Sequence, residues 1–169
     1  YTRKNGQHLV LARSTTYLVY DKDYKIRPLD FKGSDFNTLV AAEDGSGNTW
    51  LGTYEGIVCV NDSLQTIFTD TALYPSRQIT ALYKKDDSTM LAGGVGLYEL
   101  RYSNGRVLRR KFIPELDNQR ILVLFRDRLG KLWIGADNGL YRFTEQTGKL
   151  EWFDVTDNIQ NKRFNPNSL

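Results

Sequence analysis

Short apolar segments alternate with polar turns along the whole chain. The apolar segments 38–42, 79–83 and 121–125 are each five residues long, and each is followed by a turn rich in Gly, Asp, Asn or Ser. A helical repeat would need apolar positions three and four apart over about ten or more residues, and no such stretch is present. The pattern therefore predicts short β-strands joined by tight turns.

The predicted strands recur as a four-strand unit with a period of about 40 residues. The first strands are expected at 38–42, 79–83 and 121–125, the third strands at 57–60, 97–102 and 140–143, and the fourth strands at 64–68, 106–113 and 149–153. The first strand of each unit is apolar and the fourth is more polar, which is typical of a blade of a β-propeller. We therefore expect an all-β chain of about four blades, each with four antiparallel strands.

The units divide the chain into a single partial propeller. We expect a partial blade 1 at 1–31, with Asn5-Gly6 as a hairpin turn, blade 2 at 37–69, blade 3 at 77–113, blade 4 at 119–154, and a connector to a missing next blade at 155–169. Four blades are few for a closed ring, so the sequence predicts a fragment of a larger propeller.

Two segments, 44–57 and 127–140, share one spaced motif. The shared positions are Asp44, Gly47, Trp50, Gly52 and Gly56, which correspond to Asp127, Gly130, Trp133, Gly135 and Gly139. An alignment without gaps places the Trp-equivalents of blades 1 and 3 at Val10 and Met90, and the small residues two further on at Ala12 and Ala92. A Trp and a small residue at i and i+2 share one strand face, against which another sheet can pack closely. We interpret these positions as structural.

This motif resembles the two-component regulator propeller repeat, Asp-x-x-Gly-x-x-Trp-(Ile/Leu)-Gly-Thr-x-x-Gly-(Leu/Ile)-Tyr. Blade 2 departs from it with Val58 in place of Tyr, and blade 4 with Ala136 in place of Thr. The tail 165–169 is similar to the segment that precedes another blade in this family. The resemblance implies a periplasmic sensor segment of a hybrid two-component system of the Bacteroides type, which detects an oligosaccharide. The membrane helix, the histidine kinase and the DNA-binding module of such a receptor would lie outside this chain, so no catalytic residue is expected here.

Composition excludes several other kinds of site. The 169 residues are 40% hydrophobic and 25% charged, as in an ordinary globular domain. A single cysteine, Cys59, and a single histidine, His8, exclude an internal disulfide and a zinc site built on several such residues. The spacing around Asp44 and Asp127 does not supply the six to eight oxygen ligands of calcium. We expect no metal and no cofactor.

The net charge and the hydropathy of the chain limit the kinds of partner that it can be expected to bind. The net charge of +3 is too small for a nucleic-acid footprint. No apolar run approaches the about 20 residues of a membrane helix, so contact with a membrane would come only through other parts of the parent protein. The basic cluster Arg106, Arg109, Arg110 and Lys111 is interpreted as a solvated strand edge, with an anion-binding patch as the alternative.

A propeller binds ligands at one mouth of its axial channel, which is lined by the loops after the fourth strand and between the second and third strands. The candidate ligand-binding residues in these loops are Arg13, Tyr54, Tyr74, Arg77, Arg120 and Asp137. Aromatic faces and planar polar groups suit sugars and uronates. Trp152, on the fourth strand of blade 4, is expected to pack there, with a sugar or partner contact as the alternative.

Two other functions remain open at this stage. One is a glycosidase propeller of the sialidase kind, because the Asp-x-x-Gly-x-x-Trp turn is similar to an Asp box, although the Asp-to-Gly spacing differs by one residue. The other is an interaction scaffold, although the WD40 and kelch signatures are absent. An open ring leaves blade faces uncovered, so we also expect self-association or a dimer.

Overall fold

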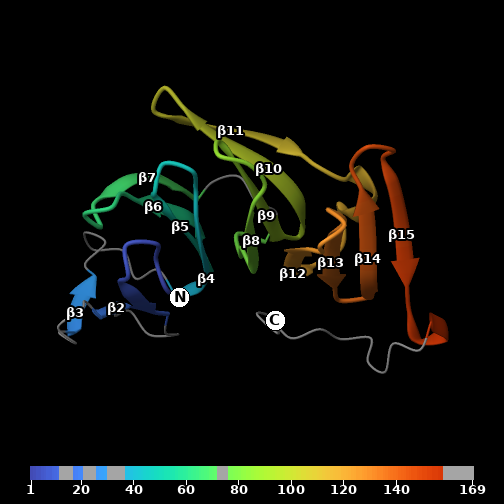
Figure 1. Ribbon diagram of the computed structural model, residues 1–169, viewed down its shortest axis with the longest axis horizontal. Coiled ribbons are helices and arrows are strands. Elements are labelled where there is room, and N and C mark those ends of the chain that lie inside the picture. The colour runs from blue at the N-terminus through green and yellow to red at the C-terminus, as the bar shows by residue number, and fades with distance from the viewer. Residues whose placement is uncertain (12–16, 21–25, 30–36, 72–75, 158–169) are drawn as a thin grey trace.

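The computed structural model describes residues 1–11, 17–20, 26–29, 37–71 and 76–157, and in this part of the chain it is built almost entirely from antiparallel strands. Three four-stranded sheets and one three-stranded sheet follow one another along the chain, and within each sheet the strands are neighbours in sequence order. The sheets are arranged side by side around an arc (Figure 1). The prediction of all-β propeller blades is confirmed.

Each sheet is one blade. Blade 1 contains β1 (His8–Val10), β2 (Tyr17–Tyr20) and β3 (Ile26–Leu29); blade 2 contains β4 (Thr38–Glu43), β5 (Thr49–Thr53), β6 (Gly56–Val60) and β7 (Thr66–Asp70); blade 3 contains β8 (Ala81–Lys84), β9 (Thr89–Gly94), β10 (Gly96–Ser103) and β11 (Arg106–Lys111); and blade 4 contains β12 (Ile121–Arg126), β13 (Leu132–Ala136), β14 (Gly139–Thr144) and β15 (Lys149–Phe153). Two short 3-10 helices, η1 (Pro114–Leu116) and η2 (Val155–Asp157), follow β11 and β15.

Blade 1 has a short additional strand at its start. Thr2 forms an antiparallel bridge with His8, and the backbone N–H of Leu9 donates to the carbonyl of Tyr1 at 2.8 Å. The turn between them contains Gly6 at φ +84°, a conformation that glycine adopts without strain. Residues 1–3 therefore take the place of a first strand in this blade.

The first strands of the blades lie at the inner side of the arc. β8 contacts β4 on one side and β12 on the other, so these three strands line the hub. The fourth strands, β7, β11 and β15, are the outer edges of their sheets. The apolar-to-polar gradient in each unit follows from this placement, because inner strands are covered on both faces.

The hydrophobic core lies between the blades. Seam 1–2 contains Leu9, Leu51, Val58 and Val60; seam 2–3 contains Trp50, Ile57, Cys59, Ile79, Leu82, Met90, Ala92, Tyr98 and Leu100; seam 3–4 contains Ala81, Leu91, Leu97, Ile113, Leu116, Ile121, Leu124, Leu132, Ile134, Ala136 and Tyr141. Each blade is thus stabilised mainly by burial against its neighbours, as in other repeat architectures.

Glycines in the second strands let the blades approach each other. A Cβ atom at Gly52 would lie 2.6 Å from Val40 Cγ1 and 2.8 Å from the carbonyl oxygen of Ile79 in blade 3. A Cβ atom at Gly93 would lie 2.6 Å from Ile121 Cγ2 in blade 4. Because both contacts are closer than carbon and oxygen atoms tolerate, only glycine fits at these two positions.

The expected register of blade 3 is wrong by one residue. Leu91 packs in seam 3–4, as Trp50 packs toward blade 3, whereas Met90 and Ala92 face back into seam 2–3. Leu91 therefore takes the Trp position and Gly93 the small-residue position. The cause is a shorter hairpin: Val95 alone joins β9 to β10, whereas two residues join the corresponding strands of blades 2 and 4. The gapless alignment could not include this deletion.

In blade 1 the expected Trp-equivalent position is also wrong by one residue. Leu9 is buried in seam 1–2 and takes the Trp position, while Val10 points to the other face and is 40% exposed. Leu11 also packs in seam 1–2, at the place expected for the small residue. Ala12 lies outside the described residues.

Several strand ends also differ from expectation. β8 begins at Ala81, two residues after Ile79, which instead covers Gly52. β7 begins at Thr66, because Leu64 occupies a turn position at φ +64°. β11 ends at Lys111, shortly before Pro114 begins η1. Proline cannot donate to a sheet ladder, so the strand cannot continue through it.

Candidate functional site

The repeated Asp-to-Trp spacing forms a hydrogen-bonded turn. In blade 2, Asp44 Oδ1 accepts the backbone N–H groups of Ser46 at 2.9 Å and Asn48 at 3.0 Å, while Oδ2 accepts the Trp50 indole N–H at 3.0 Å. One carboxylate thus caps the turn and positions the indole. Trp50 is only 1% exposed and meets the edge of Phe68 at 5.0 Å. Its role is to pack seam 2–3, and it is not available to stack on a sugar.

Blade 4 repeats this turn with the same atoms. Asp127 Oδ1 accepts the backbone N–H groups of Leu129 and Lys131, both at 2.9 Å, and Oδ2 accepts the Trp133 indole N–H at 2.8 Å. These hydrogen bonds, that from Trp133 above all, hold the pKa of Asp127 below its ordinary value. Trp133 stacks on Phe125 at 6.0 Å, with the Arg142 guanidinium 5.4 Å from its ring centre.

We expect the Asp127–Trp133 contact to survive mild acid. Because the folded-state pKa of Asp127 lies below the unfolded value of about 3.9, the carboxylate stabilises the fold above that value, and this contribution is lost as the pH falls through the folded-state pKa. The indole N–H resonance of Trp133, followed by NMR, should stay constant from pH 7 to about 5 and shift only below the ordinary aspartate pKa. The exposed Trp152 is the internal control. A shift of the Trp133 resonance near neutral pH would contradict this assignment.

A buried arginine, which the sequence analysis did not single out, ties blade 1 to blade 2. Arg3 is 1% exposed. Its guanidinium donates to Thr49 Oγ1 at 2.9 Å, Gln7 Oε1 at 2.5 Å, Asp62 Oδ1 at 3.2 Å, and the carbonyl oxygens of Asp62, Asn61 and Gly47 at 3.0, 3.3 and 3.4 Å. Glu43 Oε1 lies 3.6 Å from Nε and completes the charge balance. Burial and the nearby Glu43 carboxylate raise the pKa of Tyr1, at the same end of the chain, to about 12.

The cluster around Arg3 lies at the end of the blades opposite the expected ligand mouth. It joins the turns 43–48 and 61–65 of blade 2, whereas the mouth is formed by the hairpins between second and third strands. Arg3 is followed by Lys4 and a polar turn, so the sequence offers no sign that it is buried. Its role is structural.

Four of the six candidate ligand residues lie along one rim at the mouth end. Arg77 Nη1 is 3.6 Å from Glu55 Oε2, next to Tyr54 in the β5–β6 hairpin. Arg120 Nη2 donates to Gln78 Oε1 at 3.0 Å, and the backbone N–H of Asp137 donates to the carbonyl of Arg120 at 3.1 Å. A continuous chain of contacts therefore links blades 2, 3 and 4 at this end. Arg13 and Tyr74 lie outside the described residues.

The rim also collects buried polar atoms that lack partners. Among the described residues, the buried side-chain oxygens without a hydrogen bond belong to Asn37, Thr38, Asp70, Asp117 and Asn138. Asn37 and Thr38 begin blade 2, Asp70 ends β7, Asp117 lies in the connection between blades 3 and 4, and Asn138 lies in the β13–β14 hairpin. All five thus occur at the mouth end. Unpaired buried polar groups are costly to the fold.

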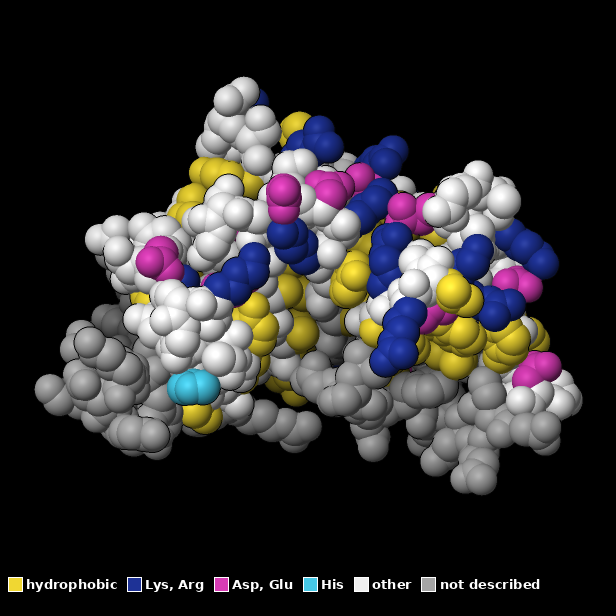
Figure 2. All heavy atoms as spheres, viewed as in Figure 1, with side chains coloured by type: hydrophobic (Ala, Val, Ile, Leu, Met, Phe, Trp, Pro, Cys, Tyr) yellow, Lys and Arg dark blue, Asp and Glu magenta, His cyan; other side chains and the backbone are white. Residues whose placement is uncertain are grey.

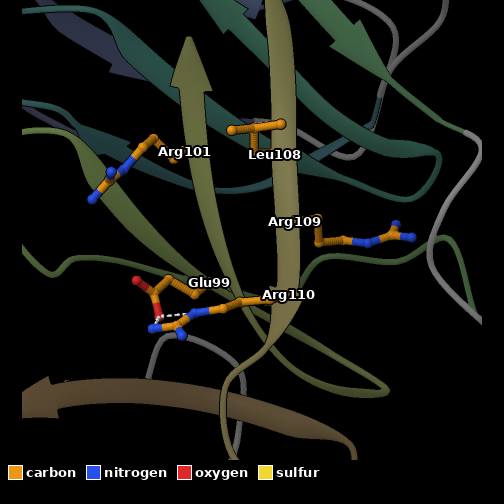
Figure 3. A pocket seen from close by; sticks show the side chains of 5 residues that line it. All are labelled: Glu99, Arg101, Leu108, Arg109 and Arg110. Carbon is orange, nitrogen blue, oxygen red and sulfur yellow. Dashed lines mark hydrogen bonds and ion pairs between the residues drawn. The ribbon is translucent and has the colours of Figure 1, made fainter.

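A separate hollow of about 390 Å³ opens at the outer edge of blade 3 (Figure 3). Its lining residues are Glu99, Arg101, Leu108, Arg109 and Arg110. Arg110 pairs with Glu99 at 2.6 Å, while Arg109 projects from the other side of β11. The expected basic strand edge is therefore partly neutralised by its own sheet. Figure 2 shows Lys and Arg side chains interspersed with acidic ones on the visible face, without one continuous basic patch.

The remaining chemistry-bearing residues do not form a second site. Cys59 is buried in seam 2–3, where burial raises the pKa of its thiol. His8 is exposed and exchanges a hydrogen bond with Thr2 at 2.9 Å. Within the described ranges, no three His, Cys, Asp or Glu side chains come together as metal ligands. The same ranges contain no helix with the length and hydrophobicity needed to cross a membrane.

A comparison with protein families finds a match at the segment that leads into and begins blade 4. Residues 115–138 match the family described as "Two component regulator propeller". They include the end of η1, all of β12, the Asp127 turn and β13 with Trp133. The match is confined to this segment and is a similarity of one repeat, not of the whole chain. Blade 2 forms the same Asp-to-Trp turn with the same atoms, so the turn inside the matched segment occurs twice in the described residues.

Solved structures share the fold of this repeat protein at low sequence identity. The extracellular domain of a hybrid two-component system of B. thetaiotaomicron is 16% identical with a TM-score of 0.68, over 89% of this chain and 24% of that one. Virginiamycin B lyase of Staphylococcus aureus is 13% identical with a TM-score of 0.67, over 91% and 54%. PorZ, a surface component of the type-IX secretion system of Porphyromonas gingivalis, is 14% identical with a TM-score of 0.68, over 96% and 28%. At these identities the likeness establishes the propeller fold alone.

A sequence match to curated proteins adds no function. Residues of this chain are 28% identical over 117 positions to Protein SEY1 of Ajellomyces capsulatus. The match covers 69% of this chain and only 13% of the length of that relative. An alignment of that extent assigns no family and no activity.

Proposed function

We propose that this chain is a segment of the extracytoplasmic sensor propeller of a hybrid two-component system, and that its mouth-end rim binds an oligosaccharide. The observation that carries the proposal is the two-component regulator propeller repeat at residues 115–138, which forms part of a blade beside that rim. Ligand binding would be passed to a histidine kinase elsewhere in the parent protein and would control transcription. The periplasmic location belongs to the same proposal.

The composition of the rim supports a sugar ligand. Tyr54 supplies an aromatic face, while Arg77 and Arg120 supply planar groups that can bind hydroxyls or a uronate carboxylate. Both arginines are exposed, so their side chains can contact a ligand without any change in the packing of the core.

We propose further that this segment is not an enzyme. A sialidase-like site would need an arginine cluster, a tyrosine nucleophile and an acid pair at one mouth. Among the described rim residues, Arg77 is paired with Glu55 and Arg120 with Gln78, so each arginine contacts a neighbouring side chain rather than a tyrosine. Turnover of a chromogenic sialoside would contradict the proposal and favour the glycosidase.

We expect the triple variant Tyr54→Ala, Arg77→Ala, Arg120→Ala to lose oligosaccharide binding by at least about tenfold, because each lost contact is worth on the order of 1 kcal/mol. The measurement is isothermal titration calorimetry with defined oligosaccharides, both neutral and uronate-containing, on the full-length receptor ectodomain that contains this chain. All three side chains are exposed or partly buried, so the substitutions should leave the fold intact.

The matched control is Arg106→Ala, which removes an exposed arginine from the β10–β11 hairpin at the opposite end of blade 3. It should bind like the wild type. Unchanged binding in the triple variant would remove the rim from the proposal. Failure of every oligosaccharide to bind the wild-type ectodomain would remove the sugar ligand.

A further inference from the structure

One position before the inner strand carries a planar polar side chain in three successive blades. In blades 2, 3 and 4, one residue of the inner strand pairs with the glycine at the small-residue position of the second strand. These pairs are Val40 with Gly52, Ala81 with Gly93, and Val123 with Gly135. Three residues before the inner-strand member lie Asn37, Gln78 and Arg120, here called the inner ring. Its members are two amides and one guanidinium.

The inner ring lies at the mouth end, next to the hub. β8 contacts β4 on one side and β12 on the other, so the residues that precede these strands are neighbours from blade to blade (Figure 1). Arg120 Nη2 donates to Gln78 Oε1 at 3.0 Å, which joins blade 4 to blade 3 directly. Asn37 has the corresponding position one blade earlier. The inner ring therefore forms the inner margin of the rim, closer to the hub than the hairpins of Tyr54 and Asp137.

Backbone hydrogen bonds hold two members of the inner ring in place. The backbone N–H of Tyr54 donates to the carbonyl of Asn37, and that of Asp137 donates to the carbonyl of Arg120, both at 3.1 Å. Each position is thus attached to the hairpin of its own blade. A side chain on a backbone held in this way loses less conformational entropy on binding a ligand.

The third member, Gln78, is held by a close approach of the backbone. A Cβ atom at Gly94 would lie 2.3 Å from the carbonyl oxygen of Gln78, so only glycine fits there. The next residue, Ile79, donates its backbone N–H to the carbonyl of Thr53 in blade 2 at 2.9 Å. Arg77, the preceding residue, has φ +57°, which is unfavourable for a residue with a Cβ atom. Such strained positions are concentrated at functional sites.

The two rim arginines differ in the charge of their partners. Arg77 lies 3.6 Å from a carboxylate oxygen of Glu55, so a side chain of the same chain already balances its charge. Arg120 is exposed and donates instead to the amide of Gln78, which carries no charge. A guanidinium has further N–H donors beyond the one used in this hydrogen bond, and these match a carboxylate in a planar, bidentate pair. Arg120 is thus suited to an anionic ligand group.

We propose that the inner ring recognises an acidic oligosaccharide, in which the Arg120 guanidinium binds the carboxylate of a uronic acid unit and the amides of Gln78 and Asn37 bind neighbouring hydroxyls. Amides both donate and accept hydrogen bonds, as sugar hydroxyls do, so the three side chains match the two kinds of polar group on a uronate. This inference rests on the proposed sugar-binding function and narrows it, because the inner ring selects the ligand by its charge.

The test compares acidic oligosaccharides with their neutral counterparts. Oligogalacturonates and glucuronate-containing xylo-oligosaccharides, each beside the same compound with its carboxylates reduced to alcohols, are titrated by calorimetry into the ectodomain that contains this chain. The wild type should bind at least one acidic compound about tenfold or more tightly than its reduced form. In Arg120→Gln this ratio should fall to about one, while affinity for the reduced form changes by less than about threefold, because an amide still binds hydroxyls.

A second variant places a competing carboxylate beside Arg120. Gln78→Glu keeps the length of the side chain and the oxygen that accepts from Arg120, but its negative charge should occupy the guanidinium and lower affinity for the acidic compound at least about tenfold. The matched control is Gln65→Glu, which makes the same change at an exposed amide that accepts from Asn61 Nδ2 at 3.2 Å, in the turn before β7 at the opposite end of blade 2. It should bind like the wild type. Circular dichroism establishes that each variant is folded.

The possible failures are distinguishable. Equal binding of the acidic and reduced forms by the wild type, or an acidic preference that persists in Arg120→Gln, would overturn this inference and leave the sugar-binding rim in place. An equal loss of affinity in Gln65→Glu and Gln78→Glu would also overturn it, because net charge alone would then explain the effect. If the wild type bound none of the oligosaccharides in either form, the proposed sugar ligand would be wrong together with this inference.

Discussion

Replacing Trp50 with alanine should lower the free energy of unfolding by about 3–5 kcal/mol, the usual cost of removing a large aromatic side chain from a core. Trp50 is 1% exposed, contacts Phe68 and donates to Asp44, so Trp50→Ala opens a cavity in seam 2–3 and removes one partner of a buried carboxylate. Urea denaturation followed by circular dichroism measures the change.

The chain offers a control of the same residue type. Trp152 is 54% exposed on the outer strand of blade 4, so Trp152→Ala should change the free energy of unfolding by much less than Trp50→Ala. Trp50→Phe separates the two causes, because it keeps most of the ring but leaves Asp44 without the indole donor. Equal effects at Trp50 and Trp152 would show that the repeat tryptophan does not hold the blades together.

Removing Arg3 should be nearly as costly. Arg3→Ala removes the cation beside the buried Glu43 carboxylate and the guanidinium donor to the carbonyl oxygens of Gly47, Asn61 and Asp62, and breaking a buried charge pair from one side costs about 3–5 kcal/mol. Because these contacts join blade 1 only to blade 2, amide hydrogen exchange should accelerate most in residues 1–11. Urea denaturation gives the total loss, and mass-resolved hydrogen exchange gives its location.

Arg106→Ala is the control for Arg3, since it removes an arginine that is exposed in a hairpin. Its effect should lie within about 0.5 kcal/mol of zero, as for most surface substitutions. If Arg3→Ala were equally mild, the guanidinium cluster would be a consequence of the fold rather than a support for it.

The blade architecture could be predicted from sequence because two signals agreed. The alternation of short apolar segments with turns gave the strand type, and the shared spacing of Asp44, Gly47 and Trp50 with Asp127, Gly130 and Trp133 gave the repeat. The structure shows why that spacing persists. A single carboxylate must reach two backbone N–H groups and the indole N–H, so the number of residues between Asp and Trp cannot change.

The register of blade 3 could not be predicted in the same way. Blade 3 lacks the Trp, and Gly93 and Gly94 are adjacent small residues, so no side chain marks the face that each position takes. A side chain's face changes with every one-residue slip in a strand, and the single-residue hairpin at Val95 produces such a slip. Only the packing of Leu91 against blade 4 settles the register.

The sequence predicted which loops lie together at one end of the blades, but not how the side chains in those loops are paired. Placing loops at one mouth located Tyr54, Arg77, Arg120 and Asp137 on a common rim, because the strand order fixes which loops share an end. The pairing of Arg120 with Gln78 and the buried oxygens of Asp70 and Asn138 depend on side-chain packing between blades, which no single segment encodes.

The short hairpin of blade 3 has a consequence for how such chains diverge. With one residue fewer, Gly96 donates its backbone N–H to the carbonyl of Gln119, and Val95 pairs with Arg120, so the lost length is compensated locally while Leu91 and Gly93 keep their places. A change of one residue in this hairpin therefore leaves the packing between the blades unchanged. Chains built from this repeat can alter the surface of the mouth-end loops by changing hairpin length, while the buried positions that hold the blades together stay the same.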